Sequence, residues 1–186
     1  MTIEAAVEAV RAGLVVGLPT DTVYGIGVDP LNEAAVARLF ALKGRPEHKP
    51  VGLLVGTIDQ ARMIAEIKGQ AEELAVAHWP GALTLVVTPR VILANWVGDA
   101  QQRTVGIRVP DHPVALELLE ACGPLAVTSA NRSGGVEARD DGDARAIFGD
   151  EVAFYLPGSA PGGEASTVVD ATGARLTVLR QGPIYL

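Results

Sequence analysis

Hydrophobic residues along this chain fall into two patterns: short continuous apolar runs, and apolar positions spaced three and four residues apart. The runs predict buried strands and the spacing predicts helices. Strands are expected at residues 14–18, 51–55, 83–88, 104–109 and 125–128, and near 151–156, 167–170 and 175–180. Helices are expected at residues 2–12, 33–43, 58–78 and 113–122, the third one broken near Gly69. Strands interleaved with helices predict an α/β fold with a mixed sheet.

The ends of the first two helices carry recognisable signals. Thr2 and Asn32 can each cap a helix N-terminus, and Gly13 and Gly44 are typical of helix C-termini. Two other stretches show no periodicity. Residues 89–103 are irregular, and residues 136–150 hold so many Asp, Glu and Arg residues that we expect a solvated surface segment.

The sequence LPTDTVYGIG, residues 18–27, places polar groups directly after a buried strand. Pro19 cannot donate to a strand ladder, and it is followed by three hydroxyls and one carboxylate, from Thr20, Asp21, Thr22 and Tyr24. Gly25 and Gly27 then let a ligand approach the backbone closely. Ligands of open α/β sheets bind where strands end, so this stretch is a candidate ligand crevice. The alternative is an ordinary exit from a strand into a turn.

Composition limits the class of protein. The 186 residues predict one domain, residues 1–186, and a hydrophobic content of 48% is enough for a full core. The formal net charge is −7, with only 15 Lys plus Arg. Proteins that hold nucleic acid through its phosphates are usually basic, so we expect weak or no direct nucleic-acid binding.

The chain carries no signal for export or membrane insertion. Residues 1–18 include Glu4 and Glu8 and no basic leader, unlike a signal peptide, and no apolar run approaches the roughly 20 residues of a membrane helix. The single cysteine, Cys122, excludes an internal disulfide. We therefore expect a cytoplasmic protein.

Several common catalytic motifs are absent. The sequence has no phosphate-binding G-x-x-x-x-G-K-[ST] loop and no G-x-S-x-G elbow, and the dinucleotide fingerprint fails after Gly27. His48, His78 and His112 lack metal-ligand spacing, so no protein metal site is predicted. Cys122 is expected to pack at a helix end rather than act as a nucleophile.

What remains is a group of small polar and basic residues at predicted strand and helix ends. Its members are Lys43, Arg45, Arg108, Thr128, Ser129, Asn131, Ser133, Ser166, Thr167 and Arg180. Cations beside hydroxyls suit the binding of phosphate and carboxylate. Each has a plainer interpretation: Lys43 as a cation at a helix C-terminus, Arg108 as a surface strand residue, and residues 129–135 as a turn. Together they indicate an anion-binding α/β domain.

Seven motifs in order give the chain a close resemblance to the YrdC-type family of threonylcarbamoyl-AMP synthases. They are PTDTVYGIG (19–27), LKGRPEHKPVGLLV (42–55), WPGALT (79–84), TVGIRVPDHP (104–113), TSANRSG (128–134), STVVD (166–170) and LRQG (179–182). The family pairs a K-x-R with a distant S-x-N, here Lys43/Arg45 and Ser129/Asn131. The resemblance implies an α/β fold whose twisted mixed parallel/antiparallel sheet has flanking helices and a large concave face.

The resemblance also implies an activity and its partners. Family members form threonylcarbamoyl-AMP and pyrophosphate from L-threonine, bicarbonate and ATP. Mg²⁺ is the expected companion of ATP. Partner proteins then transfer the threonylcarbamoyl group to the adenosine beside the anticodon of ANN-decoding tRNAs. No covalent enzyme intermediate is needed, because positioning and charge stabilisation at the phosphates can lower the barrier.

Site roles follow from the same resemblance, residue by residue. The catalytic motif residues would be Lys43, Arg45, Ser129 and Asn131. Threonine would be held by Thr20 or Thr22, Arg108, Ser129 and Ser166, and the nucleotide by Lys43, Arg45, Thr104, Asn131 and Arg180. Apolar neighbours of these polar clusters, Val23, Ile26 and Val127, would surround the threonine methyl group.

The sequence also fits three alternative functions. The first is an RNA-binding or ribosome-assembly module that uses the same concave face, which the net charge of −7 disfavours. The second is a carbamoyl-transfer enzyme of hydrogenase maturation, whose full-length form needs zinc-finger cysteines that one cysteine cannot supply. The third is an unrelated phosphate-binding α/β protein.

Overall fold

The computed structural model describes residues 2–44, 46, 49–162 and 164–186. Its helices are α1 (Ile3–Arg11), α2 (Glu33–Lys43), α3 (Ile58–Ile64), α4 (Gln70–His78), α5 (Pro113–Cys122), α6 (Asp141–Phe148) and a short 3₁₀ turn (Gly149–Glu151). The strands are β1 (Val16–Leu18), β2 (Gly25–Val28), β3 (Gly52–Leu54), β4 (Leu83–Val87), β5 (Val105–Arg108), β6 (Leu125–Ser129), β7 (Phe154–Tyr155), β8 (Thr167–Asp170) and β9 (Thr177–Arg180).

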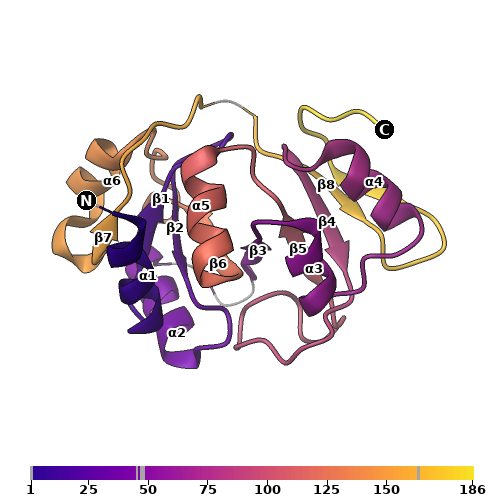
Figure 1. Ribbon diagram of the computed structural model, residues 1–186, viewed down its shortest axis with the longest axis horizontal. Helices are drawn as coiled ribbons and strands as arrows, with labels where there is room; N and C mark the ends of the chain where they lie inside the picture. The colour runs from indigo at the N-terminus through magenta and orange to yellow at the C-terminus, as the bar shows by residue number, and fades with distance from the viewer. Residues whose placement is uncertain (1, 45, 47–48, 163) are drawn as a thin grey trace.

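Within the described residues, nine strands form one mixed sheet in the order β7-β1-β2-β6-β3-β5-β4-β8-β9. The pairs β1–β7, β3–β5 and β4–β8 are parallel and the other neighbours are antiparallel. Helices α1, α2 and α6 gather at the β7–β1 end, and α3 and α4 lie at the β4–β8 end (Figure 1). The predicted mixed α/β sheet with flanking helices is therefore confirmed.

The two faces of the sheet are covered differently. Ile26, Leu53 and Ile107 share one face and pack in the larger core with residues of α2, α3, α4 and α6. Val16, Leu18 and Leu125 share the other face and pack in a smaller core with α1 and α5. Among the described residues, α1 and α5 are the helices that pack on this second face, and they do so toward the β7 end.

The predicted helix ends are mostly confirmed. The Asn32 Oδ1 accepts from the Ala35 N–H at 3.1 Å, and Gly44 adopts the left-handed conformation, with φ 62°, after Lys43. Thr2 stands at the N-cap of α1, but its side chain accepts no capping hydrogen bond from the helix, so that expectation is wrong. The helical region 58–78 divides as expected, with Gly69 at the N-cap of α4.

Two stretches differ from the sequence-based expectation. Residues 25–28 form β2, although two glycines hide its strand pattern. Residues 136–150 are only partly solvated, because they contain α6, which Asp140 caps and which buries Ala144 and Phe148. Its abundant charges mark one face of an amphipathic helix. Among the described residues, no helix is both long enough and apolar enough to cross a membrane.

Candidate functional site

A pocket of about 720 Å³ lies on the sheet face that α1 and α5 cover only in part. Glycines of three strands, Gly25, Gly52 and Gly106, form part of its lining. A Cβ on Gly52 would lie 2.9 Å from the Gly106 carbonyl oxygen, and one on Gly25 would lie 2.8 Å from Val127 Cγ1. Side chains at these positions would collide with their neighbours, so bare backbone forms this part of the pocket wall.

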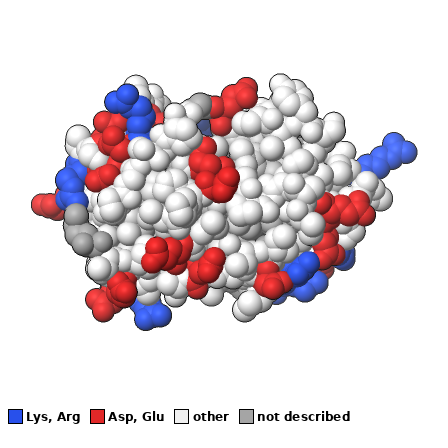
Figure 2. All heavy atoms as spheres, turned by 45° about the horizontal axis from the view of Figure 1, so that its top comes forward, with Lys and Arg blue, Asp and Glu red and all other residues white. Residues whose placement is uncertain are grey.

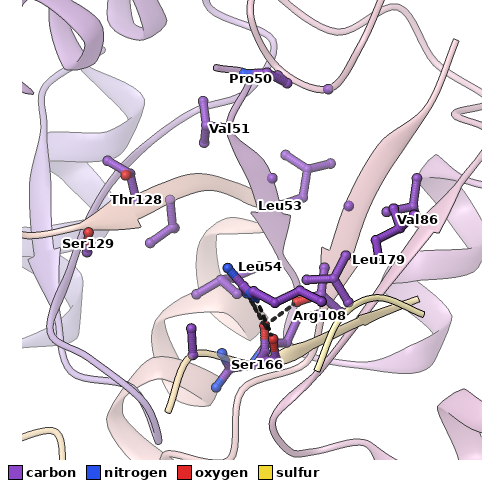
Figure 3. A pocket seen from close by; sticks show the side chains of 18 of the residues that line it. Pro50, Val51, Leu53, Leu54, Val86, Arg108, Thr128, Ser129, Ser166 and Leu179 are labelled. Carbon is purple, nitrogen blue, oxygen red and sulfur yellow. Dashed lines mark hydrogen bonds between the residues drawn. The ribbon is translucent and has the colours of Figure 1, made fainter. Parts of the chain in front are cut away.

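Residues predicted from separate motifs meet around this pocket. Ten residues were given a role in binding threonine or the nucleotide. Seven of them line the pocket: Thr20, Thr22, Thr104, Arg108, Ser129, Ser166 and Arg180. In Figure 3, Ser129 lies on β6 at one side, Val86 and Leu179 lie at the opposite side, and Arg108 and Ser166 lie between them. Segments more than 140 residues apart in the sequence thus contribute to one site.

Arg108 is the most deeply buried cation of the pocket wall, with 7% of its surface exposed. Its Nη2 forms an ion pair with Asp21, its Nη1 donates to Thr22 Oγ1 at 3.0 Å, and its Nε donates to the Gly81 carbonyl at 3.0 Å. Burial lowers the pKa of Arg108, and the Asp21 charge opposes this shift. The guanidinium stays protonated, so its orientation is fixed by three partners. The interpretation of Arg108 as a surface residue is wrong.

Arg180 and Ser166 form a second polar group at the C-terminal wall. Arg180 donates to the Ser166 carbonyl through Nε at 3.0 Å and through Nη2 at 2.9 Å. Its Nη2 also lies 3.2 Å from Ser166 Oγ, which is 2.8 Å from Thr84 Oγ1. Ser166 is buried although it lines the pocket, whereas Arg180 is exposed. A cation and two hydroxyls therefore converge on one edge of the cavity.

Lys43, Ser129 and Asn131 form a third polar group beside β6. Lys43 Nζ donates to the carbonyl oxygens of Ser129 and Asn131 at 2.7 and 3.2 Å, to Ser129 Oγ at 3.2 Å and to Asn131 Oδ1 at 2.6 Å. The Asn131 amide donates to the Gly135 carbonyl at 2.6 Å. Lys43 and Asn131 are both buried, and both contact Ser129, through which this group reaches the pocket.

The same contacts decide between two interpretations of Lys43. A cation that merely caps α2 should interact with the last carbonyls of that helix. Those carbonyls have other partners, because Arg132 donates to Leu42 O and the Ser133 N–H donates to Lys43 O at 2.8 Å. Arg132 therefore fills the capping role, and the Lys43 side chain joins α2 to the loop after β6.

The remaining predicted residues lie as follows. Thr20 and Thr22 both line the pocket, but the Thr20 hydroxyl donates to the Val23 carbonyl at 2.6 Å and so holds its own turn. Thr104 lines the opposite rim, where its backbone pairs with Asp99. Arg45 lies outside the described residues. The roles assigned to these residues stay predictions.

Some lining residues were not expected from the sequence. Thr84 and Val86 line the pocket from β4, where buried and half-buried positions alternate in the structure. In the sequence, Thr84 alone interrupts the apolar run 83–87, so Val86 had no signal. Asp99, Gln102, Glu137 and Asp170 add polar groups. Val23 and Val127 line the cavity as expected, whereas Ile26 does not, because it points to the opposite face and packs in the core.

The cysteine and histidines give no sign of a second reactive centre in the described part of the chain. Burial raises the pKa of the Cys122 thiol to about 11, so it stays protonated and unreactive at neutral pH. His112 Nδ1 is buried without a hydrogen-bond partner, and His48 lies outside the described residues. No cluster of three or more potential metal ligands occurs among the residues that the structure describes.

Charge on the molecular surface follows the composition. The face shown in Figure 2 carries acidic side chains across its middle, while Lys and Arg lie toward its periphery. The cations of the pocket, Arg108 and Arg180, are accompanied by Asp99, Asp170 and Glu137 in its lining. The pocket therefore has positive charge at Arg108 and Arg180 without being basic as a whole.

Comparison with known proteins identifies similar chains. The Sua5/YciO/YrdC family model, described as "Telomere recombination", matches residues 8–182. A Mycobacterium tuberculosis protein provisionally named threonylcarbamoyl-AMP synthase is 48% identical over 98% of this chain and 84% of its own length. The threonylcarbamoyl-AMP synthase of Vibrio cholerae is 38% identical over 97% of both chains.

A solved structure extends the comparison to three dimensions. Pyrococcus abyssi Sua5 complexed with L-threonine superposes with a TM-score of 0.90 and is 36% identical. The match covers 97% of this chain and 54% of that one, so this chain spans about half the length of that relative. The likeness therefore includes nearly every element described above.

Proposed function

The chain belongs to the Sua5/YciO/YrdC family, and from this premise we propose that it is the threonylcarbamoyl-AMP synthase that serves tRNA modification. The enzyme uses L-threonine, bicarbonate and ATP and releases pyrophosphate. One structural observation carries the proposal: seven residues predicted from five separate motifs surround a single pocket. The relative complexed with L-threonine supports threonine as one substrate.

The reaction has two bond-forming steps. The neutral amine of threonine attacks carbon dioxide derived from bicarbonate and loses a proton, which gives a carbamate. A carbamate oxygen then attacks the α-phosphorus of ATP, and the bond to pyrophosphate breaks. Neither step needs a covalent bond to the protein, so catalysis rests on holding the reactants together and on stabilising negative charge at the phosphates.

The groups of the pocket suit the two ends of this product. Arg108 and the hydroxyls of Thr22 and Ser166 bind the threonine carboxylate and side chain, with Ser129 at the same end. A fixed guanidinium is well suited to a carboxylate because of its planar donors. Arg180, Thr104 and the Lys43–Asn131 pair bind the nucleotide. Arg45 is assigned to the nucleotide on the K-x-R motif alone.

Mg²⁺ enters this proposal as part of the substrate. The phosphates of ATP supply oxygen ligands for Mg²⁺, which binds through few protein groups at such sites. Asp99 and Asp170 in the pocket lining are carboxylates of the required type. When bound, the ion would withdraw charge from the phosphates, and the cations of the chain would hold the same phosphates in place.

The test is pyrophosphate release with each substrate omitted in turn. We expect release only when ATP, threonine and bicarbonate are all present. ATP cleavage that is indifferent to threonine would contradict the proposal. Transfer of the threonylcarbamoyl group to tRNA falls to partner proteins, and adding them with an ANN-decoding tRNA should give the modified adenosine. We further propose that the enzyme works in the cytoplasm, where tRNA is modified.

An RNA-binding module using the same face is the second candidate. The net charge of −7 disfavours this candidate, because RNA phosphates are themselves negatively charged. A titration of unmodified tRNA at two salt concentrations separates the candidates. Submicromolar binding without threonine-dependent pyrophosphate release would favour the binding module.

A further inference from the structure

The C-terminal residues 181–186 follow β9 and turn back over the segment 165–167, which carries Ser166 to the pocket. A Cβ on Gly182 would lie 2.3 Å from the Ala165 carbonyl oxygen and 2.5 Å from the Thr167 nitrogen. Only glycine permits this approach, because any side chain would collide with backbone atoms that cannot move independently. The two segments are therefore packed backbone against backbone.

Thr167 is the polar link between them. Its side chain is fully buried, and its Oγ1 donates to the Ile184 carbonyl at 2.8 Å while accepting from the N–H groups of Gly182 and Ile184, each at 3.0 Å. A hydroxyl has one donor and two acceptor sites, so all of its hydrogen-bonding capacity is used. The Thr167 N–H also donates to the Ala82 carbonyl at 2.9 Å, which fixes the segment to the start of β4.

Each of the two segments that Thr167 joins carries a pocket residue close to the joint. Ser166 directly precedes Thr167, and Arg180 lies two residues before Gly182. Arg180 donates to Ser166 O and Oγ, so a shift of either segment would move both groups relative to Arg108. A misplacement of about 1 Å in an active site can lower the rate by roughly 10²-fold.

We propose that Thr167 is a positioning residue, whose buried hydroxyl fastens residues 182–184 over residues 165–167 and thereby fixes Ser166 and Arg180 at the pocket. Thr167 does not touch the reactants. Its role rests on the proposed synthase function, but the fastening of the two segments can be measured without any reaction.

The experiment compares Thr167→Val with Thr167→Ser. Valine keeps the shape and loses the hydroxyl, whereas serine keeps the hydroxyl and loses the methyl group. We expect Thr167→Val to lower kcat/KM for threonine-dependent pyrophosphate release by about 10–100-fold and Thr167→Ser to stay within about threefold of the wild type. A purely packing role predicts the opposite order. Thr177→Val, at an exposed position of β9, is the matched control and should behave as wild type.

Amide hydrogen exchange supplies the readout that is independent of activity. In Thr167→Val, residues 165–167 and 182–184 should exchange faster while α1 and α5 are unchanged. Normal exchange and normal kcat/KM in Thr167→Val would overturn the proposal, and so would a lower Tm with unchanged activity per folded molecule. If the wild type itself shows no threonine-dependent release, the synthase function fails, and the exchange data still decide whether the segments are fastened.

A second variant covers the case in which Thr167→Val does not fold. The Gln181 amide donates to the carbonyls of Gly182 and Ile184 at 2.7 and 2.9 Å, so Gln181→Met loosens the same segment from its solvent side. We expect folded protein with faster exchange at residues 182–184 and a severalfold lower kcat/KM. Unchanged exchange and activity in this variant would overturn the proposal.

Discussion

Two buried cations border the candidate site, and the protein holds them in different ways. Arg108 is paired with the Asp21 carboxylate, so the two form a nearly neutral unit. Lys43 Nζ donates to neutral oxygens of Ser129 and Asn131, at the end of β6 and just after it. A neutral unit with fixed donors recognises a ligand by geometry, and a charged group attracts an anion. This difference suits an amino-acid end and a phosphate end of one pocket.

The comparison also predicts different costs of mutation. Removing Arg108 leaves a carboxylate in a poorly solvated place, which is expensive because its charge loses its partner. Removing the Lys43 amine takes a donor from the neutral oxygens of Ser129 and Asn131, and the loss of a donor to neutral acceptors costs less. Arg108 should therefore matter more for folding, and Lys43 more for the reaction.

Lys43→Met should lower kcat/KM by about 10²–10³, because preorganised charge at a transferring phosphoryl group is worth that much. The free energy of unfolding should fall by about 1–3 kcal/mol, since Ser129 and Asn131 lose a buried donor. Assays of pyrophosphate release beside chemical denaturation measure both. Lys68→Met, at an exposed lysine, is the matched control. Wild-type turnover in Lys43→Met would remove the phosphate role.

Arg108→Met should lower the free energy of unfolding by about 3 kcal/mol, because the Asp21 side chain, only 16% exposed, loses its counter-charge. The double variant Asp21→Asn/Arg108→Met should recover part of that loss, since it removes the unpaired charge. Chemical denaturation of Arg108→Met, Asp21→Asn and the double variant gives the three unfolding free energies of a double-mutant cycle. Strict additivity would show that the pair is not coupled.

Threonine should be preferred over serine by about 10–200-fold in kcat/KM, the usual worth of one buried methyl group. Val23 and Val127 are the apolar residues placed to contact that methyl. Competition assays with both amino acids measure the ratio, and Val127→Ala should reduce it. Equal use of serine and threonine would leave the amino-acid end without a methyl pocket.

The smallest effect is expected at Cys122, which lies at the end of α5 and does not line the pocket. Its pKa is raised from the ordinary 9.0 to about 11 by burial, so the protonated thiol stabilises the fold. This contribution is fully present below pH 9 and is lost as pH rises toward 11. Cys122→Ala should flatten the stability profile in that window and leave kcat/KM unchanged. Rapid alkylation of the native thiol at pH 8 would contradict this assignment.

The sequence alone determined most of the elements and the list of candidate residues. Local signals were sufficient where each residue acts on its neighbours, as at the Asn32 cap and at Gly44. They failed at β2, whose glycines show no strand pattern until β1 and β6 pair with them on either side in the sheet. They also failed at Thr2, since a capping residue type does not ensure a capping bond.

Only the tertiary structure decided which of those residues act together. The order of strands brings Arg108, Thr84 and Ser166 to one pocket edge, although their motifs are far apart in the sequence. It gave the capping role at α2 to Arg132 and left Lys43 for Ser129 and Asn131. It placed Ile26 on the opposite face, because side chains alternate along a strand and the pairing register fixes which face is which. Sequence supplies the chemical groups, but long-range pairing sets the distances between them.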